Sequence, residues 1–122
     1  MNAYASPYAM SPQSVATLRA PRDMEYDAFS RVTAALKAAQ SGQDAAARTA
    51  AVHQNNNLWN ILLADLSSPG NSLPADLRGD LVSLALFSVQ HGLKVMSDTA
   101  GIEPLVDINL AVMRGLRGEG MQ

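Results

Sequence analysis

Residues 74–96, PADLRGDLVSLALFSVQHGLKVM, decide the fold. Pro74 suits the first turn of a helix, and the apolar residues after it recur at spacings of three and four, which is a helical period. They form two stripes: Leu77, Leu81, Leu84 and Phe87 or Ser88 in one, and Val82, Leu86, Val89, Leu93 and Met96 in the other. Because two apolar stripes indicate burial on two sides, we expect this helix to be the central one. It should end near Thr99, with Gly101 as its stop.

Three further helices are predicted around this one. Pro21 suits a helix start, and a helix should span about 22–40 before Gly42 ends it. Asp44 can cap the next helix, which should run to about Leu66. Pro104 opens the last helix, which should run to about Leu116. The stripe of the first of these helices holds Tyr26, Phe29, Val32, Leu36 and Ala39.

The predicted fold is therefore all-α: a compact bundle of four main helices plus a short N-terminal helix or arm. Residues 1–20 form this arm or short helix, because Pro7 and Pro12 argue against one long helix. The helical domain covers 21–117, and the glycine-rich residues 118–122 form a frayed tail. We expect the apolar residues of the arm to dock on the body of the protein, with docking on a partner as the alternative.

Composition and charge exclude several classes of protein. The formal net charge of −2 and the scattered Lys and Arg residues argue against direct nucleic-acid binding. The chain has no cysteine, so it has no disulfide, thiol nucleophile or Cys-ligated zinc site. The longest apolar run, residues 84–87, is far too short for a membrane span. Since no signal peptide is recognisable either, we expect a cytoplasmic protein.

No pattern of catalytic or metal-binding residues is visible. His53 and His91 fall on different predicted helices, without ligand spacing on one helix face. The acidic residues of the last two helices lie near helix starts, where the helix dipole accounts for them. No Gly-x-Ser-x-Gly motif occurs. The sequence predicts no enzyme, no metal and no cofactor.

A few polar and aromatic residues on the apolar stripes are predicted to be structural. Trp59, the single tryptophan, should be buried in the core, with a binding hot spot as the alternative. Asn55 and Asn109 each lie on or next to a stripe, so their amides must be hydrogen-bonded. Each should bond a neighbouring helix terminus or loop, or alternatively the backbone of a partner. The predicted structural residues are Phe29, Asn55, Trp59, Leu77, Leu81 and Leu84.

Five stretches occur together in an order and spacing typical of one family. They are PRDMEY at 21–26 with Phe29, Val32 and Thr33; Asn55 with LW at 58–59; NSLP at 71–74 with LR at 77–78; IEPL at 102–105; and IN at 108–109 with Met113, Gly115 and Leu116. Together they resemble the FlaF family of flagellar biosynthesis regulators. Three departures from the family pattern are the prolines within 5–19, the alanine-rich run 45–51, and Phe87 where another aromatic, often Trp, is expected.

The resemblance implies a role in making the flagellar filament. FlaF-like proteins support flagellin synthesis and secretion, so the implied function is to bind flagellin as a secretion chaperone or adaptor. The amphipathic termini of unassembled flagellin would lie in a groove between helices. The alternative is a regulator of translation that acts through the FlbT-type mRNA-binding regulator and does not contact flagellin.

We expect the partner-binding surface to involve the last helix, which carries apolar residues on two sides. Leu105, Ile108 and Val112 lie on one side, and Val106, Leu110 and Met113 lie on the other. If one side faces the bundle, the other is exposed or covered by the arm; alternatively, both sides are core. The candidate residues are Val106, Ile108, Asn109, Leu110, Val112, Met113 and Leu116.

Overall fold

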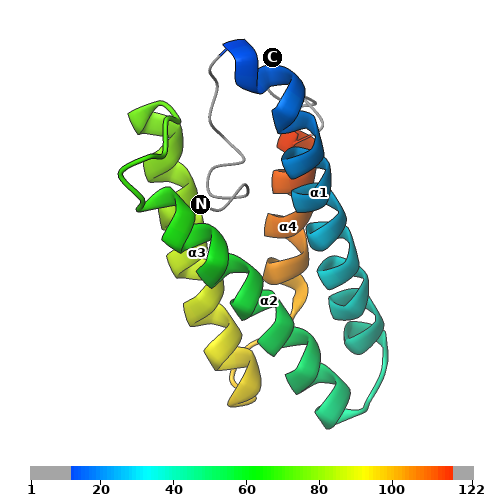
Figure 1. Cartoon of the computed structure of the whole chain (residues 1–122). Coiled ribbons are helices and arrows are strands. Elements are labelled where there is room, and N and C mark those ends of the chain that lie inside the picture. Colours follow the sequence, from blue (N-terminus) through cyan, green and yellow to red (C-terminus); the bar gives the residue numbers. More distant parts are fainter. Residues whose placement is uncertain (1–11, 117–122) are drawn as a thin grey trace.

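The computed structural model describes residues 12–116, with side chains from residue 26 onward, and this part of the chain forms helices and no strand. The helices are α1 (Pro12–Ser41), α2 (Ala45–Leu66), α3 (Ala75–Met96) and α4 (Glu103–Leu116). Consecutive helices run in opposite directions, and α4 returns beside α1 (Figure 1). The arrangement is an up-and-down four-helix bundle, which confirms the predicted all-α fold with four main helices.

The first helix begins earlier than the sequence predicted. Pro12, rather than Pro21, occupies its first turn, where the missing N–H of proline costs no hydrogen bond. Pro21 lies inside α1, although a proline there removes one backbone hydrogen bond. The predicted start near residue 22 is therefore wrong, because two prolines satisfy the same rule. The rest of the predicted arm and the tail, residues 1–11 and 117–122, lie outside the described residues.

The helix ends follow local hydrogen bonding. Asp44 caps α2 as predicted: its Oδ1 accepts hydrogen bonds from the N–H groups of Ala46 at 2.9 Å and Ala47 at 3.3 Å. By contrast, α3 ends at Met96 and not near Thr99. The chain reverses there because Asp98 adopts a left-handed conformation, with φ of 64°, and the residue after it donates its N–H to the carbonyl of Lys94 at 2.8 Å. Gly101 is not the stop.

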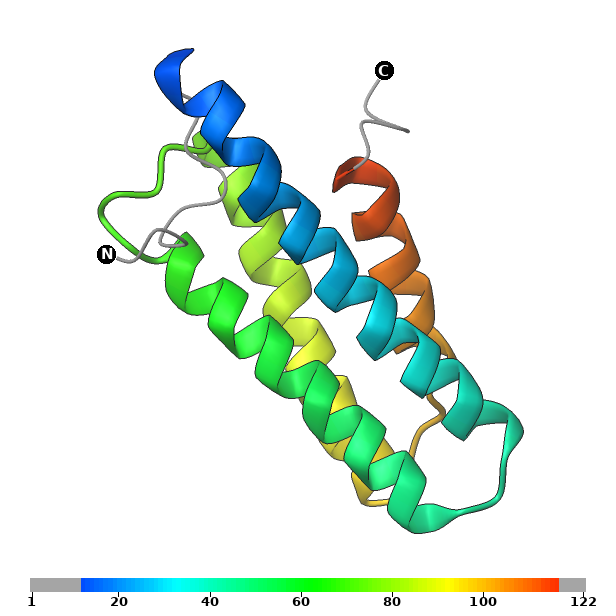
Figure 2. The same cartoon turned by 45° about the vertical axis from the view of Figure 1, so that its right-hand side comes forward.

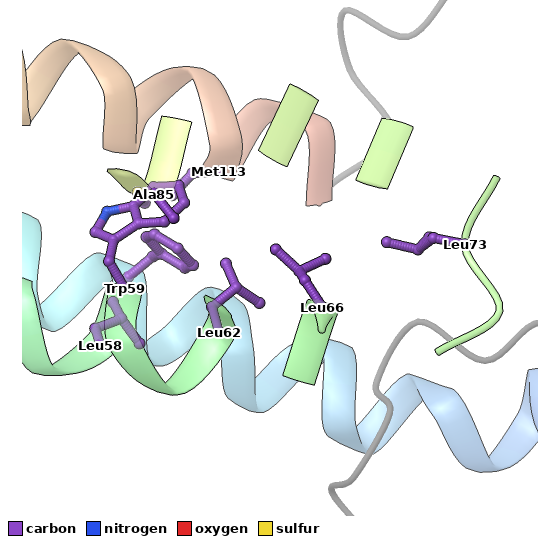
Figure 3. Packing of buried hydrophobic residues seen from close by; sticks show 8 residues of the cluster. Leu58, Trp59, Leu62, Leu66, Leu73, Ala85 and Met113 are labelled. Atoms are coloured by element: carbon purple, nitrogen blue, oxygen red, sulfur yellow. The ribbon is translucent and has the colours of Figure 1, made fainter. Parts of the chain in front are cut away.

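Two clusters of buried side chains fill the bundle. The first surrounds Trp59, whose ring meets that of Phe29 edge-on at a centroid distance of 5.4 Å. Figure 3 shows Leu62 and Leu66 projecting from α2 beside it, with Leu73 reaching in from the following loop. The second cluster lies toward the α1–α2 turn: Leu36, Ala39, Ala51, Val52, Val95, Ile102, Leu105 and Val106. Trp59 is fully buried, which confirms the prediction that it belongs to the core.

The most buried helix is α2 and not, as predicted, α3. Eight residues of α2 are buried, against Ala85, Ser88, Gly92 and Val95 in α3. Each helix of a four-membered ring has an outer side, and on α3 that side carries large apolar residues. The exposed fractions are 48% for Leu86, 48% for Phe87 and 55% for Leu93. The prediction that α3 is central is therefore wrong: its second stripe lies partly on the surface.

A glycine brings α2 and α3 into close contact. A Cβ atom on Gly92 would lie 2.6 Å from Asn56 Oδ1 and 3.1 Å from Val52 Cγ1. Both distances are shorter than ordinary van der Waals contact, so the Asn56 amide packs where a side chain of α3 would otherwise stand. Because this amide is buried, the approach fixes how the two helices meet.

Candidate partner-binding surface

A chain of buried side-chain hydrogen bonds sets the orientation of α4. Trp59 Nε1 donates to Asn109 Oδ1 at 3.0 Å, and Asn109 Nδ2 donates to Asn55 Oδ1 at 2.8 Å. Asn55 Nδ2 then donates to Ser88 Oγ at 3.1 Å. The four side chains are fully buried. The bonds therefore join α2, α3 and α4 through the middle of the bundle.

This network decides between the two predictions made for the amides of Asn55 and Asn109, which were bonding within the bundle and bonding to a partner. Asn55 and Asn109 bond side chains on other helices, rather than the helix termini or loops that the sequence suggested. Neither amide has any exposed surface, so neither is available to a partner in this structure. Since losing a buried partner costs about 1–3 kcal/mol per group, the network holds α4 in one rotation about its axis.

That rotation determines which candidate residues of α4 are accessible. Val106 and Met113 are buried along with Leu105 and Asn109, and Thr33 Oγ1 of α1 lies 3.8 Å from Met113 Sδ. Buried residues thus come from both sides that the sequence distinguished, because α4 packs between α1 and α3. The candidates that keep partial exposure are Ile108, Leu110, Val112 and Leu116.

The side of α4 turned away from α1 faces α3. Met113 marks the α1 side, and the helical period places Val112 about 100° and Ile108 about 140° around the axis from it. On α3, Leu77, Leu81 and Leu84 share the face of buried Ser88, yet each is only half-buried. These three leucines, with Ile108, Val112 and Leu116, form what we call the α3–α4 face. All six pack against the Trp59 cluster.

One contact gives the alignment of the two helices. His91 Nε2 lies 2.8 Å from the carbonyl oxygen of Gly101, just before α4. Because a carbonyl can only accept, Nε2 carries the hydrogen. Counting from this contact along antiparallel helices of equal rise places Leu84 near the level of Ile108 and Leu81 near the level of Val112. The half-buried residues of the two helices thus occur at matching heights.

The two helices separate along their length. They lie close at the connection between them, and they diverge toward the start of α3 and the end of α4 (Figures 1 and 2). Their mutual contact is the smallest among neighbouring helices of the bundle. This divergence explains why leucines that point inward on α3 keep exposed surface. An apolar face of this kind is typical of a binding site for another helix.

Other possible sites are weaker. No three His, Asp or Glu side chains gather for a metal ion in the described part of the chain. An open hollow between α1 and α2 is lined mainly by alanines, among them Ala35, Ala39 and Ala47, and offers few polar groups for orienting a ligand. None of the helices within residues 12–116 combines the length and apolar character needed to cross a membrane.

Sequence reasoning missed three residues that shape this region. Ser88 completes the amide network, and Gly92 with Asn56 sets the distance between α2 and α3. The helical spacing gives either Phe87 or Ser88 as the last member of one apolar stripe. A small polar residue on such a stripe is a signal for a buried hydrogen bond, and this signal favours Ser88. Nothing in the sequence alone identifies Asn56 as the residue that meets Gly92.

The fold and this face define a small helical-bundle protein with an apolar surface between two diverging helices. Comparison with protein families shows that the chain belongs to the FlaF family, described as flagellar protein FlaF, which matches residues 4–116. Membership implies a function connected with the flagellum. No match was found among curated proteins or among solved structures.

Proposed function

We propose that this protein is a cytoplasmic, non-catalytic flagellin-binding factor that acts as a secretion chaperone or adaptor. In this role it promotes flagellin synthesis and filament assembly. Two things support the proposal: membership of a flagellar family, and the α3–α4 face. The single observation that carries it is the pairing of half-buried apolar residues at matching heights on two helices that diverge.

The proposed mode of binding is the addition of a helix to the bundle. An amphipathic terminal helix of flagellin lays its apolar side against the α3–α4 face, with Leu81, Leu84 and Val112 as contacts. The client orders on binding, and this conformational cost lowers the affinity. A limited affinity suits a chaperone, because the client must be released for export.

The direct test is calorimetric titration of the protein with purified flagellin and with flagellin lacking either terminus. Val112→Asp places a charge on the α3–α4 face, and we expect it to weaken binding at least about tenfold, or about 1.4 kcal/mol. Ile61→Asp is the matched control, because Ile61 is an apolar residue of α2 that is 56% exposed and lies outside this face.

Folding of each variant is checked by circular dichroism. If Val112→Asp does not fold, Val112→Ser is used in its place. Full-strength binding by a folded face variant would contradict the assignment of the face. If the wild-type protein does not bind flagellin but binds the FlbT-type regulator, the protein acts on translation through that regulator, and the proposed function is wrong.

A further inference from the structure

The outer side of α2 and α3 is a second surface without charge. Residues 49–64 and residues 81–93 contain no Asp, Glu, Lys or Arg. On α2 the exposed residues there include Asn57 and Asn60, and on α3 they include Leu86, Gln90 and Leu93. We call this the uncharged face. Charged residues are depleted at the cores of protein interfaces, so the composition is typical of a surface that becomes covered.

The two uncharged stretches lie side by side. Contact of Gly92 with Val52 and Asn56 fixes the antiparallel register of the helices. The ion pair at 3.4 Å between Arg48 Nη2 and Asp98 Oδ1 agrees with this register. Charges therefore occur at the ends of the uncharged face and not within it. Figures 1 and 2 both show α2 and α3 as neighbours along their length.

The apolar stripe at the edge of this face has the spacing of a helix-pairing seam. Val82, Leu86, Val89, Leu93 and Met96 follow one another at steps of four, three, four and three, as the a and d positions of a coiled coil do. Val82, Val89 and Met96 are half-buried against the bundle, whereas Leu86 and Leu93 remain about half exposed. Packing within one chain therefore covers only part of this apolar stripe.

We propose that the uncharged face binds a second copy of this chain. A two-fold axis near Val89 and Gln90 would pack the two α3 helices antiparallel, with Leu86 against Leu93 of the partner subunit. A face without charges cannot repel its own copy. Its Asn and Gln amides both donate and accept hydrogen bonds, so they can pair across the isologous contact that such an axis produces.

The size of the face indicates a weak, reversible dimer. Two adjacent helices, each about 10 Å wide, present a strip about 20 Å across, and about 16 residues at 1.5 Å each give a length of about 24 Å. The resulting area of about 480 Å² is below the roughly 800 Å² per partner of a standard stable interface. We therefore expect a dissociation constant in the range of about 1–100 μM.

The first experiment is sedimentation of the full chain over a concentration series that spans about 1 μM to 1 mM. Wild-type protein should shift from monomer to dimer. Leu93→Lys should weaken the dimer at least tenfold, whereas Ala34→Lys, at an exposed position of α1, should leave it unchanged. A monomer throughout the series, or a dimer that tolerates Leu93→Lys, would overturn the proposal.

The second experiment uses engineered cysteines, since the chain has none. Gln90→Cys lies near the proposed axis and should form a disulfide-linked dimer under mild oxidation. Leu86→Cys mixed with Leu93→Cys should cross-link to each other more than either does to itself. Ala111→Cys, on the exposed side of α4, is the control. Cross-linking at Ala111→Cys equal to that at Gln90→Cys would contradict the proposed axis.

These results are separable from those on flagellin. The uncharged face and the α3–α4 face lie on different sides of α3, so Leu93→Lys should not change flagellin binding to monomeric protein. If the protein is monomeric and Leu93→Lys weakens flagellin binding instead, the uncharged face belongs to the client and the dimer is wrong.

Discussion

α2 and α3 are equally long, with 22 residues each, but they are buried very differently. α2 contributes Trp59, Leu62 and Leu66 to the core, and the side chains of Asn55 and Trp59 form hydrogen bonds across the bundle. α3 buries mainly small residues and exposes Leu86, Phe87 and Leu93. An apolar stripe therefore shows that a helix is amphipathic, but the position of that helix in the bundle decides how much of the stripe is covered.

The difference in burial between α2 and α3 has a functional consequence. Large side chains on α2 and the amide network make a rigid centre. α3 meets that centre mainly through small residues such as Ala85 and Ser88, and the leucines on that same side are only half-buried. These leucines contribute to the α3–α4 face, and the outer side of α3 contributes to the uncharged face. Substitutions on α2 should therefore mainly change stability, and substitutions on these two sides of α3 should mainly change association.

The largest effect is expected for Trp59→Ala. Removing a fully buried indole leaves a cavity and breaks the hydrogen bond to Asn109, so the free energy of unfolding should fall by about 3–5 kcal/mol. Urea denaturation followed by circular dichroism measures it. A loss below about 1 kcal/mol would show that α2 is not the centre of the core.

The second-largest loss of stability is expected for Asn109→Leu. It leaves Trp59 Nε1 and Asn55 Oδ1 without their buried partners, at a cost of about 1–3 kcal/mol for each group. Denaturation followed by Trp59 fluorescence measures the change. Asn57→Leu is the control, because Asn57 is an exposed amide on α2 and its replacement should be almost neutral. Equal costs for the two variants would mean that the network does not stabilise the bundle.

Two glycines of α3 give a matched pair. Gly79 has open space where a Cβ would stand, so Gly79→Ala should stabilise the protein by about 0.5–1 kcal/mol through helix propensity. Gly92→Ala gains the same propensity, but its Cβ collides with Asn56, so it should be about 1–3 kcal/mol less stable than Gly79→Ala. Thermal unfolding compares the two. Similar stability would mean that α2 and α3 can move apart without cost.

The smallest effect on folding is expected for Leu93→Gln. Leu93 is 55% exposed, and surface changes usually alter stability by less than about 0.5 kcal/mol. The measurement is urea denaturation at a protein concentration low enough to keep the chain monomeric. A loss of several kcal/mol, comparable to that of Trp59→Ala, would show that the outer stripe of α3 is core after all.

Local rules predicted much of the fold. Asp44 was identified as a cap from its place before an alanine-rich run, and Trp59 was assigned to the core from helical spacing. The same rules led to Pro21 rather than Pro12 as the start of the first helix, although both prolines suit a first turn. They also did not find the left-handed Asp98, a conformation that is uncommon for residues other than glycine.

The candidate site was less predictable. The helical period shows which residues of α4 share a side, but it does not show which neighbour that side meets. Asn55 and Asn109 were recognised as buried amides in need of partners, whereas their bonds to each other, to Trp59 and to Ser88 depend on how three helices meet. The half-exposed state of Leu81 and Leu84 follows from the divergence of α3 and α4, and periodicity carries no information about that divergence.

The most direct test of the account compares flagellin titrations of Val112→Asp, Ile61→Asp and the wild type. The account predicts that the folded Val112→Asp variant loses affinity at least about tenfold, that Ile61→Asp binds like the wild type, and that removal of one flagellin terminus abolishes binding. Equal affinity of all three proteins for intact flagellin, or no binding by the wild type, would contradict the claim that the α3–α4 face receives a flagellin helix.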